Sequence, residues 1–318
     1  MSFFGTAQQM ANLTIMVKLK LYLRLLRPHH WIKSALVFAP LFFNQHLIFT
    51  PLAFSVVLGF LSFSILSSIV YIINDMHDLE KDRLHNVKCN RPLASGEISL
   101  LNAKIVVAML SILLVALLSI SSGFDGNLCS FVAVGLLALY LLLNITYSRG
   151  LKDVPIVDVT ILASGFVIRL LFGAVIIGIK ISMWLYLVVI MWAFYMGFGK
   201  RRNEIAARKI IEQDNSAIPH FYSHGFLDKN MYVCQTLCII FYTLWSICPE
   251  TIEKFNTTAF IYTIPLVFII LLKYSLNVEI GRDADPTSVL LNDKVLLLLC
   301  VTYVICAACI LYFGSIAA

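Results

Sequence analysis

Charged side chains are scarce in this sequence, and that scarcity excludes most soluble folds. Only 13% of the 318 residues are Asp, Glu, Lys or Arg, whereas 60% are hydrophobic and the mean hydropathy is +0.87. A soluble domain needs more polar surface than this to cover its core. Short segments of alternating polarity, which a membrane-spanning barrel requires, are also lacking. The composition therefore predicts an all-α integral membrane protein.

Neither the cysteines nor the histidines are spaced as metal ligands. The eight cysteines lie mostly inside apolar segments, where a thiol behaves as a small hydrophobe, so we expect no disulfide framework. We also expect no nucleic-acid partner. Residues 1–13 lack the pattern of a signal peptide, so we expect no cleaved leader.

What the chain does have is long apolar runs, each close to the roughly 20 residues with which a helix crosses a bilayer. A hydropathy window of about 19 residues predicts about nine spans. These are residues 33–49, 52–73, 103–122, 128–146, 156–178, 183–199, 231–248, 258–275 and 294–314. The first is the weakest, being short and interrupted by Pro40. No low-complexity linker divides the chain, so we expect one membrane-embedded domain over residues 1–318.

The cations are distributed unevenly around these spans. Residues 14–27 mix Leu, Val and Met with Lys and Arg, which is typical of an amphipathic helix lying in the membrane interface. With nine spans, the loops on one side hold nearly all Lys and Arg residues, and those on the other side hold only Lys180 and Lys254. This asymmetry predicts that the basic side faces the cytoplasm and that the C-terminus lies on the far side.

Acidic and amide side chains gather where the second span ends. At about 100° per helical residue they share one arc. The group is Asn74, Asp75, Asp78 and Asp82. Its carboxylates would repel one another, and a bridging divalent cation removes that cost. Because hard oxygen ligands suit Mg²⁺, we predict that these four residues bind Mg²⁺. The alternative is a solvated acidic helix end balanced by neighbouring cations.

A second acidic segment follows the fourth span. Asp153 has the position of a helix N-cap, and Asp158 enters the fifth span, where a lone carboxylate is costly. Arg169 lies on the same helical face about 16 Å further along, too far to pair directly. Asp158 is therefore either functional or a paired core carboxylate. Arg169 either contacts substrate or stabilises a polar interior.

Further cations flank the two acidic segments, and each could either bind phosphate or only orient its helix in the membrane. They are Lys33, Arg91, Arg149, Lys152, Lys200 and Arg201. Carboxylates ringed by cations at a cytoplasmic opening suit a Mg²⁺-bound diphosphate, with a lipid tail among the helices. Metal on the leaving diphosphate would help to ionise a carbon–diphosphate bond.

The segment Asn74-Asp75-x-x-Asp78-x-x-x-Asp82 resembles the first aspartate-rich motif of the UbiA prenyltransferase superfamily. The second acidic segment, after the fourth span, agrees in position, and the resemblance covers nearly the whole chain. A finer similarity is to the branch of decaprenyl-phosphate phosphoribosyltransferases. It is carried by residues 26–33, 37–40, 147–158, 165–169 and 199–204.

This resemblance implies transfer of 5-phosphoribose from phosphoribosyl diphosphate to a polyprenyl (decaprenyl) phosphate, with release of diphosphate. It implies a Mg²⁺-dependent, multi-pass enzyme of the bacterial cytoplasmic (inner) membrane, whose active site faces the cytoplasm. Inversion at the anomeric carbon through an oxocarbenium-like state is expected. A phosphate acceptor is already ionised at neutral pH, so no strong general base is required.

The resemblance also implies roles for individual residues. Asp78, Asp82 and Asp158 are the expected catalytic residues. The first two, with Asn74, would hold the Mg²⁺–diphosphate with Asp75 in support, and Asp158 would act near the ribose. Phosphate binding or cavity structure is implied for Lys33, Lys152 and Arg169. The second segment departs from the DxxxD form of many members, because its carboxylates are five residues apart, which leaves the number of metal ions open.

Two alternatives compete with this interpretation. One is a UbiA-type enzyme that moves an isoprenyl group from its diphosphate to an aromatic acceptor; the many cations near both motifs argue against it. The other is a transporter for an anionic solute. Transporters usually have broken helices at mid-membrane, whereas the charges here lie at one boundary. The sequence does not predict the oligomeric state.

Overall fold

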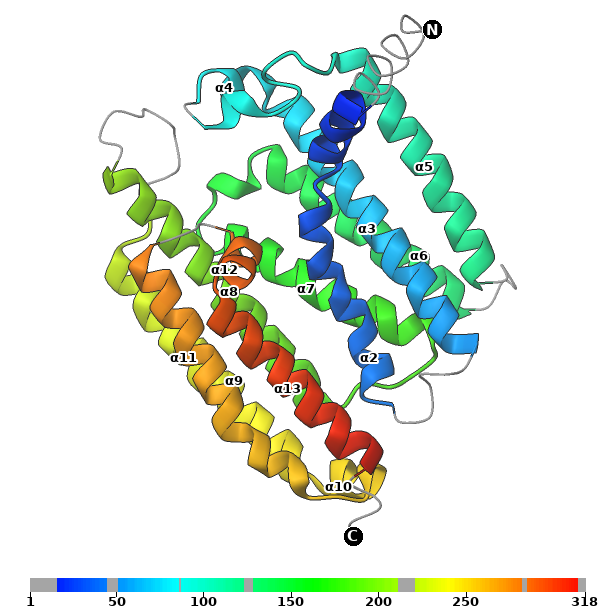
Figure 1. The fold of residues 1–318 in the computed structure, drawn as a ribbon, viewed down its shortest axis with the longest axis vertical. Helices are drawn as coiled ribbons and strands as arrows, with labels where there is room; N and C mark the ends of the chain where they lie inside the picture. The colour runs from blue at the N-terminus through cyan, green and yellow to red at the C-terminus, as the bar shows by residue number, and fades with distance from the viewer. Residues whose placement is uncertain are drawn as a thin grey trace, which may run out of the picture.

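The computed structural model consists of helices and their connections over every residue that it describes (Figure 1). The described residues are 16–44, 51–85, 87–122, 128–210, 221–281 and 285–313. No strand occurs among them. The predicted all-α class is therefore confirmed.

Within the described residues, eight helices are long and apolar enough to cross a membrane. They belong to α3 (Pro51–His77), α5 (Leu100–Ser122), α6 (Leu128–Ser148), α7 (Val157–Ile176), α8 (Met183–Ile210), α9 (His224–Ile247), α11 (Ile264–Ile280, preceded by η4) and α13 (Lys294–Phe313). Shorter elements connect or precede them. These are η1 (Pro28–Phe38), α2 (Ala39–Phe42), α4 (Leu79–Arg83), η2 (Lys88–Asn90), η3 (Leu151–Asp153), α10 (Pro249–Phe255), η4 (Ala259–Thr263) and α12 (Pro286–Asn292).

The predicted first span, residues 33–49, is not one α-helix. Its described part is the 3₁₀ helix η1 followed by the single turn α2, where Pro40 occupies the first turn. Because a 3₁₀ helix rises about 2.0 Å per residue, η1 and α2 together extend roughly 28 Å. Gly173 of α7 lets η1 approach closely, since a Cβ there would lie 2.2 Å from the carbonyl oxygen of Val37. In place of the nine predicted spans, the described residues form eight long helices and this η1–α2 segment.

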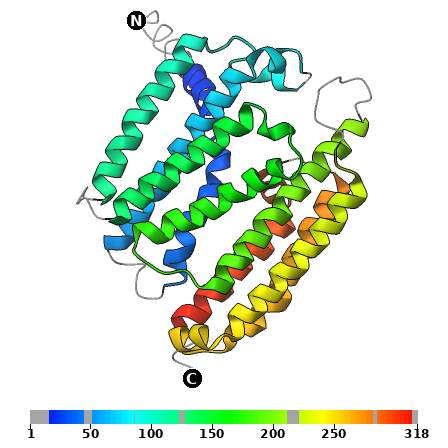
Figure 2. The ribbon, with the colours of Figure 1, turned by 180° about the vertical axis from the view of Figure 1, so that it is seen from behind.

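The elements define two ends of the bundle, which lie apart in both views (Figures 1 and 2). We call the end with α4, η2, η3 and the C-terminal end of α8 the motif end. The end with α10 and the connection from α7 to α8 is the far end. Helices α3, α6, α8 and α11 run toward the motif end, and α5, α7, α9 and α13 run away from it. The predicted acidic and basic residues therefore collect at the motif end.

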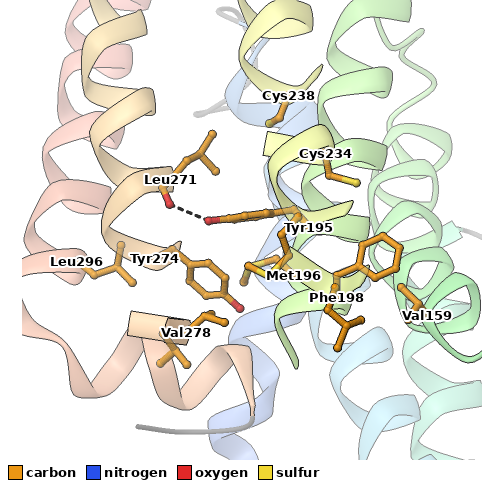
Figure 3. Packing of buried hydrophobic residues seen from close by; sticks show 13 residues of the cluster. Val159, Tyr195, Met196, Phe198, Cys234, Cys238, Leu271, Tyr274, Val278 and Leu296 are labelled. Carbon is orange, nitrogen blue, oxygen red and sulfur yellow. Dashed lines mark hydrogen bonds between the residues drawn. The ribbon is translucent and has the colours of Figure 1, made fainter. Parts of the chain in front are cut away.

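Two large clusters of buried hydrophobic residues hold the bundle together. One joins α8, α9, α11 and α13; in it Tyr195 of α8 donates a hydrogen bond of 2.7 Å to the carbonyl oxygen of Leu271 in α11 (Figure 3). The other joins η1, α3, α6 and α7 around residues such as Phe63 and Phe172. Helix α3 is mostly buried, whereas α5 has few buried residues and exposes much of its surface. In a membrane, the exposed Ile, Leu and Met side chains of α5 face lipid.

The segment before η1 is helical over residues 16–26. Residues 16–20 are exposed, and Leu25 is buried against Ile72 of α3 and Ala103 of α5. Residues 14 and 15 lie outside the described part of the chain. Interfacial placement of this helix remains a prediction.

Candidate active site

The four residues of the first acidic segment divide into two pairs. Helix α3 ends at His77, and Asp78 joins it to the single turn α4 without breaking the helical hydrogen bonds: the Asp78 amide donates to Asn74, and the Asp82 amide donates to Asp78. The arc predicted from a continuous helix is therefore present. Tertiary contacts then separate Asp75 and Asp82 from Asn74 and Asp78.

Asp75 and Asp82 are buried and share one arginine. Nη1 of Arg91 lies 3.0 Å from Asp75 Oδ1 and also contacts Asp82 Oδ2. Arg27, at the end of the N-terminal helix, adds a bidentate contact of 2.7 and 2.8 Å to Asp75. Arg27 adopts a left-handed backbone conformation, with φ of 53°, as the chain turns into η1. This pair thus ties the N-terminal helix and the loop after α4 to the end of α3.

Asn74 and Asp78 face the connection between α6 and α7 instead. The hydroxyl of Ser148 donates a hydrogen bond of 2.5 Å to Asn74 Oδ1. Nζ of Lys152, in η3, lies 3.1 and 3.3 Å from the two carboxylate oxygens of Asp78. Asp78 remains partly exposed, with a side-chain exposure of 24%. These oxygens are therefore the more accessible half of the acidic arc.

Asp158 is a paired carboxylate, held by Arg201 of α8 and by Tyr222, which precedes α9. Nε of Arg201 in α8 lies 2.6 Å from Oδ2, and the hydroxyl of Tyr222 donates to Oδ1 at 2.7 Å. The same arginine donates to the Tyr147 hydroxyl at 2.6 Å and forms an ion pair with Glu204. This network joins α6, α7, α8 and the start of α9. A narrow cleft beside it is lined by Lys152, Asp153, Asp158, Arg201 and Tyr222, among others.

Lys33 pairs with a carboxylate that the sequence analysis did not select. Its Nζ lies 2.7 Å from Oδ1 of Asp285, which also caps α12 by accepting from the amide of Thr287 at 3.0 Å. Burial would raise the pKa of Asp285, but the Lys33 ammonium more than offsets this and holds that pKa below its usual range. Lys33 is thus neutralised across the bundle rather than standing alone.

Lys88 relates these groups to one another electrostatically. Desolvation and the charge of Arg91 lower the pKa of Lys88, while Asp82, Glu204 and Asp78 act in the opposite direction. Lys88 of η2 therefore interacts electrostatically with carboxylates of both the acidic arc and α8. The clusters at the motif end form a single charged region.

Three predicted cations differ in their surroundings. Lys200 lies 3.9 Å from Glu204, one helical turn away. Arg149 is exposed and forms no salt bridge with a described residue. Arg169 is buried in the middle of α7, where it donates to the Gly165 carbonyl at 2.6 Å.

Arg169 does not join the charged region of the motif end. Its guanidinium donates to Ser67 and Tyr140, each at 3.1 Å, and stacks over the rings of Phe63 and Tyr140. No carboxylate among the described residues contacts it. These contacts satisfy Nη1 and Nη2 and place the cation in a polar spot between α3, α6 and α7, while Nε has no hydrogen-bond partner among the described residues.

The donor set of the acidic arc suits Mg²⁺. Among the described residues, no group of three or more His, Cys, Asp or Glu side chains is arranged as a metal cage. Mg²⁺ commonly binds through one or two carboxylates together with waters and phosphate oxygens. The accessible oxygens of Asn74 and Asp78, with Asp82 on the same arc, fit that mode. Asp75 is occupied by two arginines and is placed to support the others.

Several residues of this region escaped the sequence analysis. They are Arg27, Lys88, Tyr222 and Asp285. Arg27 looked like one more cation of the interfacial segment, and Lys88 like a topology signal. For Asp285, the Asp-Pro dipeptide indicates a helix start, but its partner Lys33 is 252 residues away. No local pattern reveals that contact.

Comparison with known proteins gives consistent results. Residues 34–299 match the profile of the UbiA prenyltransferase family. A decaprenyl-phosphate phosphoribosyltransferase of Corynebacterium glutamicum is 31% identical over 91% of this chain and 86% of its own length. The protein of the same name from Mycolicibacterium smegmatis is 29% identical over 92% of both chains. The resemblance found in the sequence is confirmed.

The fold has solved counterparts. A UbiA homologue from Archaeoglobus fulgidus, whose structure contains GPP and Mg²⁺, aligns with a TM-score of 0.64. It is 22% identical, and the alignment covers 92% of this chain and 99% of that one. This likeness establishes the shared helical fold.

Proposed function

The chain belongs to the UbiA prenyltransferase family and is a multi-pass membrane transferase, and we propose that it transfers 5-phosphoribose from phosphoribosyl diphosphate to a polyprenyl phosphate. The observation that carries this proposal is the pairing of cations with carboxylates throughout the motif end. A donor with a diphosphate and a 5-phosphate, plus a phosphate acceptor, brings more negative charge than an isoprenyl diphosphate with an aromatic acceptor. The names of the two bacterial relatives support the same reaction.

The ion pairs suit an exchange of partners on substrate binding. Phosphate oxygens would replace carboxylates on Arg91, Lys152, Lys33 and Arg201, while Mg²⁺ would replace the cation on Asp78. Charge-assisted bonds to phosphate are among the strongest available to Arg and Lys. Arg149 and Lys200 lie at the same end and would add to the phosphate-binding set. We assign Arg169 to cavity structure.

Asn74, Asp78 and Asp82 would hold the Mg²⁺ that accompanies the diphosphate, with Asp75 in support. When bound, the metal supplies charge neutralisation for the leaving diphosphate. The protein's task is to orient the ribose between this group and the acceptor. Asp158, which keeps the hydrogen bond from Tyr222 when phosphate takes over Arg201, would act near the ribose.

Bond changes follow from the substrates. The bond between the anomeric carbon and the diphosphate oxygen breaks, and a bond from that carbon to an oxygen of the polyprenyl phosphate forms with inversion. A phosphate monoester has its second pKa near about 6, so the attacking oxygen is ionised at neutral pH. No side chain is needed as a strong base, and none is assigned.

The test supplies purified protein with Mg²⁺, labelled phosphoribosyl diphosphate and decaprenyl phosphate, and follows label into the lipid phase. We expect a labelled lipid that disappears in excess chelator. Isoprenyl diphosphate with an aromatic acid is the matched control, and we expect no prenylated product. Prenylated aromatic product at a comparable rate would show that the protein has the other transferase activity instead. Full turnover in excess chelator would disprove the proposed requirement for Mg²⁺.

The proposed orientation places the motif end in the cytoplasm of a bacterial inner membrane, within one domain over residues 1–318. Reporter tags after residues 90 and 215 should then report cytoplasm, and a tag after residue 318 should report the opposite side. A cytoplasmic C-terminal tag would show that the η1–α2 segment does not cross.

A further inference from the structure

The far end of the bundle contains a cavity of about 330 Å³, which the transferase proposal does not use. It lies between α2, the connection from α7 to α8, the end of α9, and α10, which Figure 1 shows at the opposite end from α4. Ligand pockets typically measure about 300–1,000 Å³, so this volume lies at the small end of that range.

Two cations line this cavity, and they are the only Lys or Arg residues of the loops on that side. Lys180 comes from the connection between α7 and α8, and Lys254 from α10. Both line the same cavity although 74 residues separate them in the sequence. Positive charge is otherwise kept from this side of the protein. Two cations lining one cavity therefore indicate an anionic ligand.

Neither lysine is neutralised by the protein. Glu250 lines the same cavity, yet neither Lys180 nor Lys254 forms a salt bridge with any residue that the structure describes. Both lysines are exposed, so their ammonium groups are open to a ligand, and Lys254 contacts the Phe255 ring, whose centroid lies 5.3 Å from Nζ. The hydroxyl of Ser182, also in the lining, is buried without a hydrogen-bond partner in the described part of the chain. An oxygen-rich anion would satisfy all three groups.

The remaining walls are apolar. They include Phe43, Leu170, Leu185, Trp245 and Phe255. Leu170, Trp245 and Phe255 are almost fully buried, so the accessible apolar wall comes from partly exposed residues such as Phe43 and Leu185. A small inorganic anion would leave this surface uncovered, whereas a hydrocarbon chain would cover it. Lysines at the rim above apolar walls match the two halves of an amphiphile.

We propose that this far-end cavity binds a phosphate-bearing lipid of the opposite leaflet, with its phosphate between Lys180 and Lys254 and the start of one chain against Phe43 and Leu185. The site is separate from the transferase region, since no residue of the motif end lines it. It stands whether or not the proposed reaction is correct.

Native mass spectrometry of the detergent-solubilised full chain tests this with three probes: dioleoyl phosphatidylglycerol, dioleoylglycerol and inorganic phosphate. We expect phosphatidylglycerol to bind more tightly than either fragment. K180Q/K254Q should weaken its tightest binding roughly thirtyfold, because the two lysines contribute about 1 kcal/mol each to the attraction of an anionic headgroup and about 1.4 kcal/mol is a factor of ten. The matched variant K81Q/K104Q removes two exposed lysines on the other side of the membrane and should change nothing.

A second variant tests the apolar half. Leu185→Trp would fill the cavity while leaving both lysines in place. It should weaken the binding of phosphatidylglycerol and should not create binding of inorganic phosphate. The proposal is overturned if K180Q/K254Q binds the lipid as tightly as the unmodified chain. It is also overturned if K81Q/K104Q loses as much affinity for the lipid as K180Q/K254Q does. Saturable binding of inorganic phosphate as tight as that of the lipid would also overturn it, by showing a free-anion site.

Discussion

The two ends of the bundle are built on opposite principles. Every salt bridge between described residues lies at the motif end, where carboxylates of α3, α4, α7 and α12 meet cations from other elements. At the far end, rings of Trp245, Phe255 and Phe260 pack edge to face or tilted, and the Tyr242 and Thr263 hydroxyls bond at 2.6 Å. One end is rich in ion pairs, and the other is packed mainly with aromatic rings.

This difference indicates where stability and function reside. Buried ion pairs are weak evidence for stability, because desolvation offsets most of their attraction. Close-packed aromatic rings, in contrast, stabilise a core through buried area and dispersion. The concentration of ion pairs at one end therefore points to a substrate that exchanges with them, and the aromatic end serves as the structural anchor.

The largest effect is expected for Asp78→Asn at the motif end, a substitution that removes the carboxylate charge and keeps the shape of the side chain. We expect lipid product formation to fall about 10²–10³-fold, as when one group that stabilises a transition state is lost. The thermal unfolding midpoint in detergent should barely change, because Asp78 is partly exposed. Glu80→Gln, two residues on, is the matched control and should retain full rate. Normal turnover by Asp78→Asn would mean that the acidic arc is only surface.

Phe260→Ala tests the other end. Phe260 is fully buried, and truncating such a ring costs about 3–5 kcal/mol. We expect a clearly lower unfolding midpoint with an unchanged rate per folded molecule. Tyr262→Ala, with the ring 82% exposed, should leave the midpoint unchanged. A selective loss of rate in Phe260→Ala would contradict the division between the two ends.

Asp285 predicts a pH dependence at the motif end. Its folded pKa lies below the ordinary value of 3.8 because Lys33 outweighs the effect of burial. The stabilisation is therefore present above about pH 4 and is lost as the pH falls through the lower folded value. Asp285→Asn should lower the unfolding midpoint at neutral pH and flatten its decline below pH 4. If the unfolding midpoint of Asp285→Asn fell below pH 4 as steeply as that of the unmodified chain, other carboxylates would be responsible for the acid destabilisation.

The smallest effect is expected for Arg83→Gln. Arg83 and Glu80 form an exposed pair at 3.0 Å, worth under about 0.5 kcal/mol. Neither the unfolding midpoint nor the rate should change measurably. Arg91→Gln is the contrasting variant, because it leaves the buried carboxylate of Asp82 without its arginine and should reduce both. Equal behaviour of the two variants would show that burial does not distinguish these pairs.

Much of the motif end could be predicted from residue spacing alone. The helical angles placed Asn74, Asp75, Asp78 and Asp82 on one arc, and the structure keeps the helical hydrogen bonds that form it. The division of the arc into two pairs comes from tertiary contacts and was not predicted. Asp158 was foreseen as functional or as a paired carboxylate, and it is paired. The weak first span was correctly singled out, although the 3₁₀ geometry of η1 was not foreseen because hydropathy does not distinguish helix types.

By itself, the sequence determined the all-α membrane class, the side on which charge gathers, the family and the acidic arc, because each depends on hydropathy or on spacing within one helix. Only the tertiary structure decided the partners: Lys33 with Asp285, Arg27 and Arg91 with Asp75, and Arg201 with Asp158. It also separated Arg169 from the charged region and brought Lys180 and Lys254 to one cavity. Such contacts join segments far apart in the chain, so they depend on how helices pack rather than on any local pattern.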